Sequence, residues 1–168
     1  MPEVGLLKIE TPKVDGESKV DGHEKEIEVL SYSFGGGNSG GSQAGTGLST
    51  GTTSFQDFSI TKYVDCSSSK LFELVCKGEL IKKMQFQFLR GGEEGGGYVP
   101  YYTYHFSDVV IANIQTAGSG GDDKPMESVS FSIAGKVVQD YRVQKTDGTS
   151  ATISAGYDIK TGVPTERV

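Results

Sequence analysis

Apolar and polar residues alternate with a period of two over most of this chain, and this pattern constrains its fold more than any other feature. Such alternation is typical of β-strands that bury one face and leave the other in water. It is clear in residues 84–88, where Gln85 and Gln87 separate Met84, Phe86 and Phe88. The chain is therefore expected to be mostly β.

Seven segments fit this description, and a bend permitted by Gly135 in the sixth would make eight strands. They are residues 4–9, 26–34, 53–64, 84–88, 98–115, 127–143 and 151–159. In the second segment Leu30, Tyr32 and Phe34 are expected to face the core. The small polar residues Ser31 and Ser33 then fall on the opposite face, together with Val29, and must meet water or a partner.

One segment changes period. Leu71, Leu74 and Val75 stand at i, i+3 and i+4, which predicts a helix over about 67–77, with Gly78 as a left-handed C-terminal cap. The predicted fold is a compact antiparallel β-barrel, or two packed sheets, with this one helix at its side. We expect a single domain over 1–160 and a loose C-terminal tail over 161–168.

A glycine-rich stretch at 35–51, GGGNSGGSQAGTGLSTG, interrupts the strands. It has no charged residue, and none occurs anywhere between Glu28 and Asp57. Connections of this length without structure of their own are uncommon in compact domains, and are usually functional or disordered. Two interpretations remain open from the residues alone: a surface linker, or an arm that lies against a neighbouring subunit.

The composition excludes several classes of function. A net charge of −6 argues against nucleic-acid binding, and no run of 18 apolar residues is present for a membrane-spanning helix. The first residues, MPEVGLLKIE, do not form a standard signal peptide. Cys66 and Cys76 flank the expected helix, too far apart for a disulfide, and two thiols do not make a metal site.

No catalytic signature is found, so we expect neither catalytic residues nor a cofactor. His105 is expected to be a structural histidine in a tyrosine-rich strand, and His23 lies in a polar loop. The carboxylate pairs Glu26/Glu28, Glu93/Glu94 and Asp122/Asp123 are expected to be solvated charges rather than acid–base machinery.

Four segments, together with the glycine-rich stretch between the first two, resemble the hemolysin-coregulated protein (Hcp) family, which forms the tube of bacterial type VI secretion systems. They are GESKVDGHEKEIEVLSYSFG (16–35), FQDFSITKYVDCSSSKLFELVCKG (55–78), FLRGGE (88–93) and AGSGGDDKPMESVSFSIAGK (117–136). The resemblance runs from about residue 4 to residue 159, in the family's order and spacing.

This resemblance implies a homo-hexameric ring that stacks into a tube, enclosed by contractile sheath proteins and tipped by a spike protein. The tube would carry effector proteins in its lumen, and would pass from the bacterial cytoplasm to a target cell without a cleaved signal peptide. On this basis the glycine-rich stretch becomes an inter-subunit arm, and two polar strand faces become lumen lining. The arm candidates are Gly36, Gly37, Asn38, Ser39, Gln43, Leu48 and Thr50, and the lumen candidates are Ser31, Ser33, Asp57, Ser59 and Thr61.

Two alternatives stay open at this point. A soluble barrel that binds a small ligand would need an apolar interior cavity, against which the polar alternation argues. A secreted enzyme would need a catalytic constellation, which the sequence does not show.

Overall fold

The computed structural model describes residues 4–40, 51–92, 97–144 and 150–165. These residues form one helix, α1 (Ser68–Lys77), and strands that pair only in antiparallel fashion. The strands are β1 (Val4–Thr11), β2 (Lys13–Val14), β3 (Ile27–Val29), β4 (Ser31–Ser33), β5 (Gly36–Asn38), β6 (Thr53–Phe55), β7 (Phe58–Tyr63), β8 (Ile81–Gly91), β9 (Tyr98–Ala117), β10 (Met126–Ile133), β11 (Lys136–Gln144), β12 (Ser150–Asp158) and β13 (Val163–Pro164). The predicted mostly β, antiparallel fold with one helix is confirmed.

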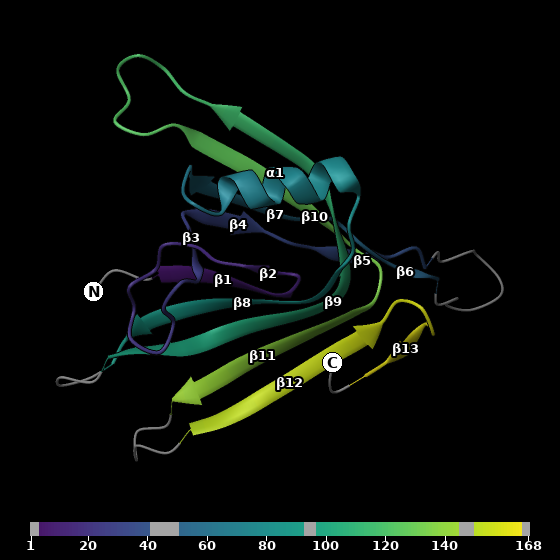
Figure 1. The fold of residues 1–168 in the computed structure, drawn as a ribbon. Helices are drawn as coiled ribbons and strands as arrows, with labels where there is room; N and C mark the ends of the chain where they lie inside the picture. The colour runs from purple at the N-terminus through teal and green to yellow at the C-terminus, as the bar shows by residue number, and fades with distance from the viewer. Residues whose placement is uncertain (1–3, 41–50, 93–96, 145–149, 166–168) are drawn as a thin grey trace.

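The main sheet rolls into an open barrel (Figure 1). Its strands follow each other in the order β3, β1, β8, β9, β10, β7 and β4. Because β3 and β4 are separated in the chain by Leu30 alone, the two ends of this path come together. The long strand β9 pairs with β8 and β11 through its first half and with β10 through its second half. Asp108, at the change of partners, has a positive φ of 53°.

Aromatic and aliphatic side chains fill the interior. The ring centroid of Phe58 lies 5.0 Å from that of Phe106 and 5.3 Å from that of Phe86, and all three side chains are fully buried. Burying one such side chain stabilises a fold by roughly 1.5–3 kcal/mol. Alternate side chains of β7 and β10 therefore form part of the core, with Ile60 and Val129 among them.

Helix α1 packs on the core side of the main sheet. Leu71 and Leu74 are buried in the core, and Figure 1 shows α1 lying across β7 and β10. Gly78 ends the helix in the left-handed conformation, with φ 60° and ψ 33°, as predicted. The backbone N–H of Gly78 donates to the carbonyl of Val75 at 3.2 Å, and that of Glu79 to the carbonyl of Leu74 at 3.1 Å. These bonds satisfy carbonyls that the end of a helix leaves open.

The segment 26–34 is not one strand, which corrects the prediction of its faces. β3 pairs with β1 and β4 pairs with β7, so the alternation breaks at Leu30, where the chain changes partners. Val29 is therefore buried, whereas Leu30 is 50% exposed. Tyr32 still contacts the core, its ring centroid 4.6 Å from that of Phe86.

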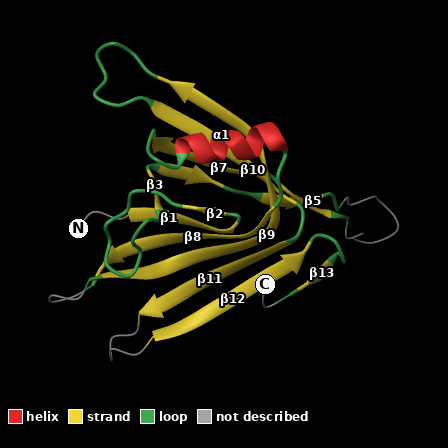
Figure 2. Cartoon of the chain, viewed as in Figure 1, coloured by secondary structure: helices red, strands yellow, loops and turns green. Residues whose placement is uncertain are grey.

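Short strands account for the other differences from the sequence prediction (Figure 2). Among the described residues, seven strands have six residues or more, and the remaining six have only two or three. Six of the seven predicted segments contain the long strands, residues 127–143 holding both β10 and β11, whereas the predicted segment 26–34 contains only short ones. Another short strand, β13, pairs with β12, and Thr165 donates its N–H to the carbonyl of Gly156 at 3.0 Å. This part of the expected loose tail is therefore paired.

Candidate functional site

The outer side of β4, β7, β10 and the second half of β9 carries a continuous set of uncharged polar side chains. Residues directly opposite each other in an antiparallel pair project to the same side of the sheet. The strand registers give one row of Ser31, Thr61, Ser128 and Gln115, and a second row of Ser33, Ser59, Ser130 and Asn113. We call these eight residues the polar face. The Oγ atoms of Ser59 and Ser130 are hydrogen-bonded at 3.2 Å.

Four of the five predicted lumen residues lie together on the polar face, namely Ser31, Ser33, Ser59 and Thr61. Asp57 does not join them, because it is an exposed residue that precedes the first residue of β7. The sequence analysis did not offer Asn113, Gln115, Ser128 or Ser130 as site residues. The alternation of serines in β10 was a usable signal, but only the pairing of β10 with β7 and β9 places these residues beside the others.

Behind the polar face, an ion-pair network is buried under the helix. Lys62 is completely buried, and its Nζ lies 2.9 Å from Oδ1 of Asp65 and 2.9 Å from Oε1 of Glu127. Nζ of Lys62 also donates to Oγ of Ser68 at 3.3 Å and to the carbonyl of Tyr63 at 2.9 Å. The network joins β7, β10 and the first turn of α1, and so fixes the helix to the strands that carry the polar face.

The base of the glycine-rich arm is a two-stranded ribbon. β5 pairs with β6, and the Asn38 side chain closes the ribbon: its Oδ1 accepts from the N–H of Gly40 at 2.9 Å and from that of Gly51 at 3.0 Å. Phe55 anchors the ribbon by stacking on Phe34, with centroids 5.8 Å apart. Gly36, Gly37, Asn38 and Ser39 of the predicted arm are exposed here, whereas Gln43, Leu48 and Thr50 lie outside the described residues.

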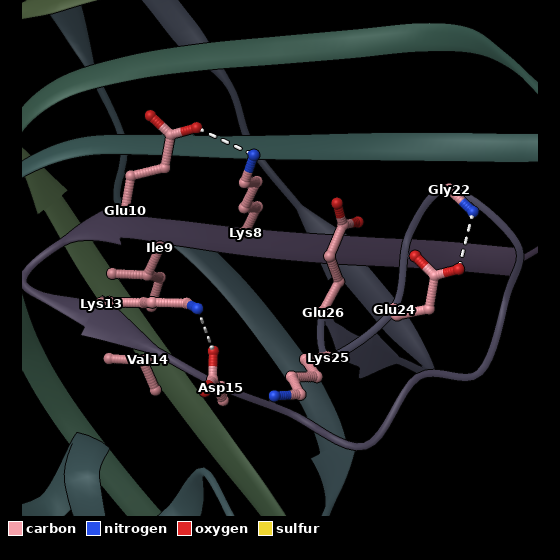
Figure 3. A pocket seen from close by; sticks show the side chains of 10 residues that line it. All are labelled: Lys8, Ile9, Glu10, Lys13, Val14, Asp15, Gly22, Glu24, Lys25 and Glu26. Carbon is pink, nitrogen blue, oxygen red and sulfur yellow. Dashed lines mark hydrogen bonds and ion pairs between the residues drawn. The ribbon is translucent and has the colours of Figure 1, made fainter.

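A hollow beside β1 and β2 is lined by charged side chains that largely neutralise one another (Figure 3). Lys8 pairs with Glu10 at 3.0 Å, Lys13 with Asp15 at 3.4 Å, and Glu24 accepts from the N–H of Gly22 at 3.2 Å. The hydrogen bond from Lys8 holds the pKa of Glu10 below its ordinary value, and Lys83 adds to this. Each of these three carboxylates is engaged by a lysine or a backbone N–H, and exposed ion pairs such as the two lysine–carboxylate pairs contribute at most about 1 kcal/mol each.

The histidines are held by carboxylates, which agrees with the structural role predicted for His105. Its Nε2 lies 3.0 Å from Oδ2 of Asp140, whose other oxygen accepts from Oγ of Ser154 at 2.5 Å. The serine contacts the carboxylate and not the imidazole, so the three residues are not ordered as a catalytic triad. His23 is likewise 3.2 Å from the carboxylate of Glu26. Glu93 and Glu94 lie outside the described residues.

In the described part of the chain, no group of three or more histidine, cysteine, aspartate or glutamate side chains is placed to hold a metal ion. No helix within the same residues has the length and apolar character to cross a membrane.

Comparison with known proteins places this fold among secretion proteins. Residues 6–141 match the family described as "Type VI secretion system effector, Hcp". The chain is 33% identical over 152 residues to protein hcp1 of Pseudomonas aeruginosa, covering 89% of this chain and 92% of that protein. Among solved structures, Hcp1 of Salmonella typhimurium is 31% identical with a TM-score of 0.79, covering 98% of this chain and all of that one. A structure described as a type six secretion system protein is 30% identical with a TM-score of 0.86, over 98% of this chain and all of the other.

Proposed function

Because the chain belongs to the Hcp family of type VI secretion system proteins, we propose that it is a tube subunit: six copies form a ring, and stacked rings form the tube. The observation that carries this proposal is the polar face, an uncharged surface on the opposite side of its sheet from the core and the helix. A wall of this kind, facing inward, can hold a protein cargo without binding it tightly. The protein then acts mechanically and not as an enzyme.

Two free sheet edges support side-by-side assembly. Among the described strands, β4 pairs only with β7, and β9 beyond Val109 pairs only with β10. Exposed edges are sites at which another chain can add a strand. The two edges differ, as a heterologous ring interface requires, and six four-stranded segments would close one continuous wall with the polar face inside. The arm would span the same joint from one subunit to the next.

The charge of the chain fits export and assembly better than a nucleic-acid partner. Six copies carry 6 × (−6) = −36, which keeps free rings soluble and disfavours binding to phosphate backbones. The partners in this proposal are further copies of the chain, effector proteins in the lumen, the spike at the tip and the contractile sheath. The subunit would be made in the bacterial cytoplasm and leave it through the type VI system.

No observation favours the two alternatives. The interior that a ligand-binding barrel would leave open is filled by Phe58, Phe86 and Phe106. For an enzyme, the buried charges would have to reach a substrate, but Lys62 and Glu127 are sealed beneath the helix.

The solution mass tests the ring. Light scattering after size exclusion should give about 107 kDa, which is six subunits of 17.9 kDa. The arm is tested by removing residues 41–50 and joining Gly40 to Gly51, which is feasible because both residues bond the same side-chain oxygen of Asn38. We expect this deletion to lower the mass. If the deletion variant remains a hexamer, the arm is only a linker. If the full-length protein is monomeric at all concentrations, the proposed ring is contradicted.

Cargo retention tests the lumen. Ser33→Gln adds bulk to the polar face, so rings of this variant should keep their mass and lose bound effector, measured by co-purification. Ser69→Gln is the matched control, because Ser69 is exposed on α1 and away from the polar face. Equal effector retention in both variants would contradict the lumen role of Ser33.

A further inference from the structure

A hollow of about 360 Å³ lies on the outside of the barrel, over β8, the first half of β9, β11 and β12. These strands run side by side in Figure 1. The strand registers place Gln87 opposite Thr103 and Thr103 opposite Asp140, so these three side chains project to the same side of the sheet. The volume is within the range of small-molecule sites. We call this feature the outer hollow.

The outer hollow faces away from the core and from the polar face. Gln87 follows Phe86, whose side chain is buried inside the barrel. Phe86 contacts Phe58 of β7 across this interior, with ring centroids 5.3 Å apart, and the polar face is on the other side of β7. The outer hollow and the polar face are therefore on opposite walls of the barrel. A ligand in the outer hollow would be neither an interior ligand nor a cargo on the polar face.

The backbone beneath the outer hollow is already paired on both sides. At Gln85 and Gln87, β8 pairs with both β1 and β9. Thr103 of β9 pairs with Gln87 on one side and with Asp140 of β11 on the other. A peptide therefore cannot bind here by adding a strand to the sheet, which requires a free edge. A ligand of the outer hollow must be recognised by side chains.

Two half-buried amides line the outer hollow without a partner of their own. Among the described residues, the side chains of Gln85 and Gln87 form no hydrogen bond with another residue. Each amide offers two N–H donors and a carbonyl acceptor. Saccharide hydroxyls both donate and accept hydrogen bonds, so a pair of free amides two residues apart on one strand matches neighbouring hydroxyls of a sugar ring.

Arg142 adds a cation that has no carboxylate partner within the described part of the chain. Its guanidinium donates to Oγ of Ser150 at 3.0 Å and forms no ion pair there. Asp140 also lines the outer hollow, but its two oxygens are engaged by His105 at 3.0 Å and by Ser154 at 2.5 Å. A guanidinium binds carboxylates through paired, charge-assisted hydrogen bonds. The free charge therefore favours a ligand that carries a carboxylate.

Tyr101 supplies an aromatic surface in the same hollow. Its ring is held by the guanidinium of Arg90, 5.0 Å from the ring centroid, and by the ring of Phe88, with centroids 5.5 Å apart. An aromatic ring presents an apolar surface on which the C–H face of a sugar can lie. Amides for hydroxyls, a cation for a carboxylate and an aromatic ring for an apolar face are the three contacts that an acidic sugar requires.

We propose that the outer hollow is a binding site for an acidic saccharide. Gln85 and Gln87 bind ring hydroxyls, and Arg142 binds the carboxylate of a uronic acid unit. Tyr101 contacts the apolar side of the sugar ring. This inference is independent of the proposed ring, because every residue that it uses belongs to one chain.

Isothermal titration calorimetry of the full-length protein tests the site. The probes are digalacturonic acid and galactobiose, its neutral counterpart without the carboxylates. We expect the wild-type protein to bind the acid roughly tenfold more tightly than the neutral sugar, since hydrogen bonds to charged groups are the stronger ones. Arg142→Gln should remove this difference, and Gln87→Ala should weaken binding of both sugars.

Gln139→Ala is the matched control for Gln87→Ala. Gln139 is exposed on β11 but is the register partner of Tyr104, so it projects to the other side of the sheet. This variant should bind both sugars as the wild type does. The thermal denaturation midpoint of each variant shows whether it is folded. Because Arg142 is exposed, Arg142→Gln keeps the test valid even if Gln87→Ala does not fold.

Three results would overturn the proposal. The first is a wild-type protein that binds neither sugar, as expected if another surface covers the outer hollow. The second is equal affinity for the acid and the neutral sugar, unchanged in Arg142→Gln. The third is an equal loss of binding in Gln139→Ala and Gln87→Ala, which would place the sugar elsewhere on the molecule.

Discussion

Lys62 is the residue whose environment differs most from what its chemistry suggests. A lysine in an alternating strand would normally face water, yet Lys62 follows Phe58 and Ile60 on the inner face and is completely buried. Removing a charge from water is costly unless partners and hydrogen bonds replace the water. Glu127 of β10, Ser68 of α1 and Asp65 in the loop between β7 and α1 supply these partners.

Replacing this lysine should therefore be among the most damaging single changes. Lys62→Met removes the cation and leaves the carboxylates of Asp65 and Glu127 without their partner, which should lower the free energy of unfolding by about 3–5 kcal/mol. Urea denaturation measures the loss. The control is Lys82→Met, an exposed position on β8, where the change should be small. Equal losses in the two variants would show that burial of the charge is not the cause.

Glu10 should make stability depend on pH. Its pKa is lowered in the folded chain from 4.5, first by the hydrogen bond from Lys8 and then by Lys83. A lowered folded pKa means that Glu10 stabilises the fold above its unfolded pKa, and that this contribution disappears as the pH falls through the folded value. Glu10→Gln should cost about 0.2–1 kcal/mol near neutral pH.

Denaturation of wild type and Glu10→Gln at a series of pH values measures this contribution. The difference between them should begin to shrink below pH 4.5 and disappear once the pH lies below the lowered folded pKa of Glu10. Glu28→Gln, at an exposed position on the neighbouring strand β3, controls for loss of a negative charge alone. If the difference in the free energy of unfolding between wild type and Glu10→Gln stayed constant with pH, the loss of stability would come from packing and not from the charge of Glu10.

Helix α1 depends on one backbone conformation at its end. Gly78 has φ 60°, which an L-residue with a Cβ adopts at a cost of about 1–2 kcal/mol. Gly78→Ala should destabilise the protein by this amount, seen as a lower denaturation midpoint with an unchanged slope. Gly37→Ala is the control, because no positive φ constrains Gly37 and the space around its Cβ is open. If Gly78→Ala left the stability of the protein unchanged, the backbone at the end of α1 would have adopted another conformation without cost.

Strands and the helix could be predicted from the sequence where a local residue pattern specifies them. Period-two alternation located the seven long strands, and the spacing of Leu71 and Leu74 located the helix to within one residue at its start. The break at Leu30 was not predictable, because it arises from a change of partner strand, which no local pattern encodes. The same reason explains the polar face: its serines were visible in the sequence, but Ser59 and Ser130 meet across the β7–β10 pair although they are 71 residues apart in the chain.

For the whole molecule, the two sides of one sheet differ in what they face: one side carries the polar face, and the other packs on the core and α1. Thr61 and Ser128 project to the polar face, while the adjacent Lys62 and Glu127 project to the core beneath α1. If the polar face lines a lumen, α1 must be on the outer surface of the ring. The exposed thiol of Cys76, close to the end of α1, offers a native reporter of that surface.

Beads coated with maleimide, which cannot enter a ring, should capture rings through Cys76 in a Cys66→Ser background. Cys66 is removed because burial and the neighbouring Asp65 raise its pKa, which slows its reaction. Rings whose only thiol is Ser31→Cys, in a chain that also carries Cys66→Ser and Cys76→Ser, should not be captured until urea separates the subunits. Capture of the intact Ser31→Cys rings as fast as the Cys76 rings would place the polar face outside, and would contradict its role as a lumen wall.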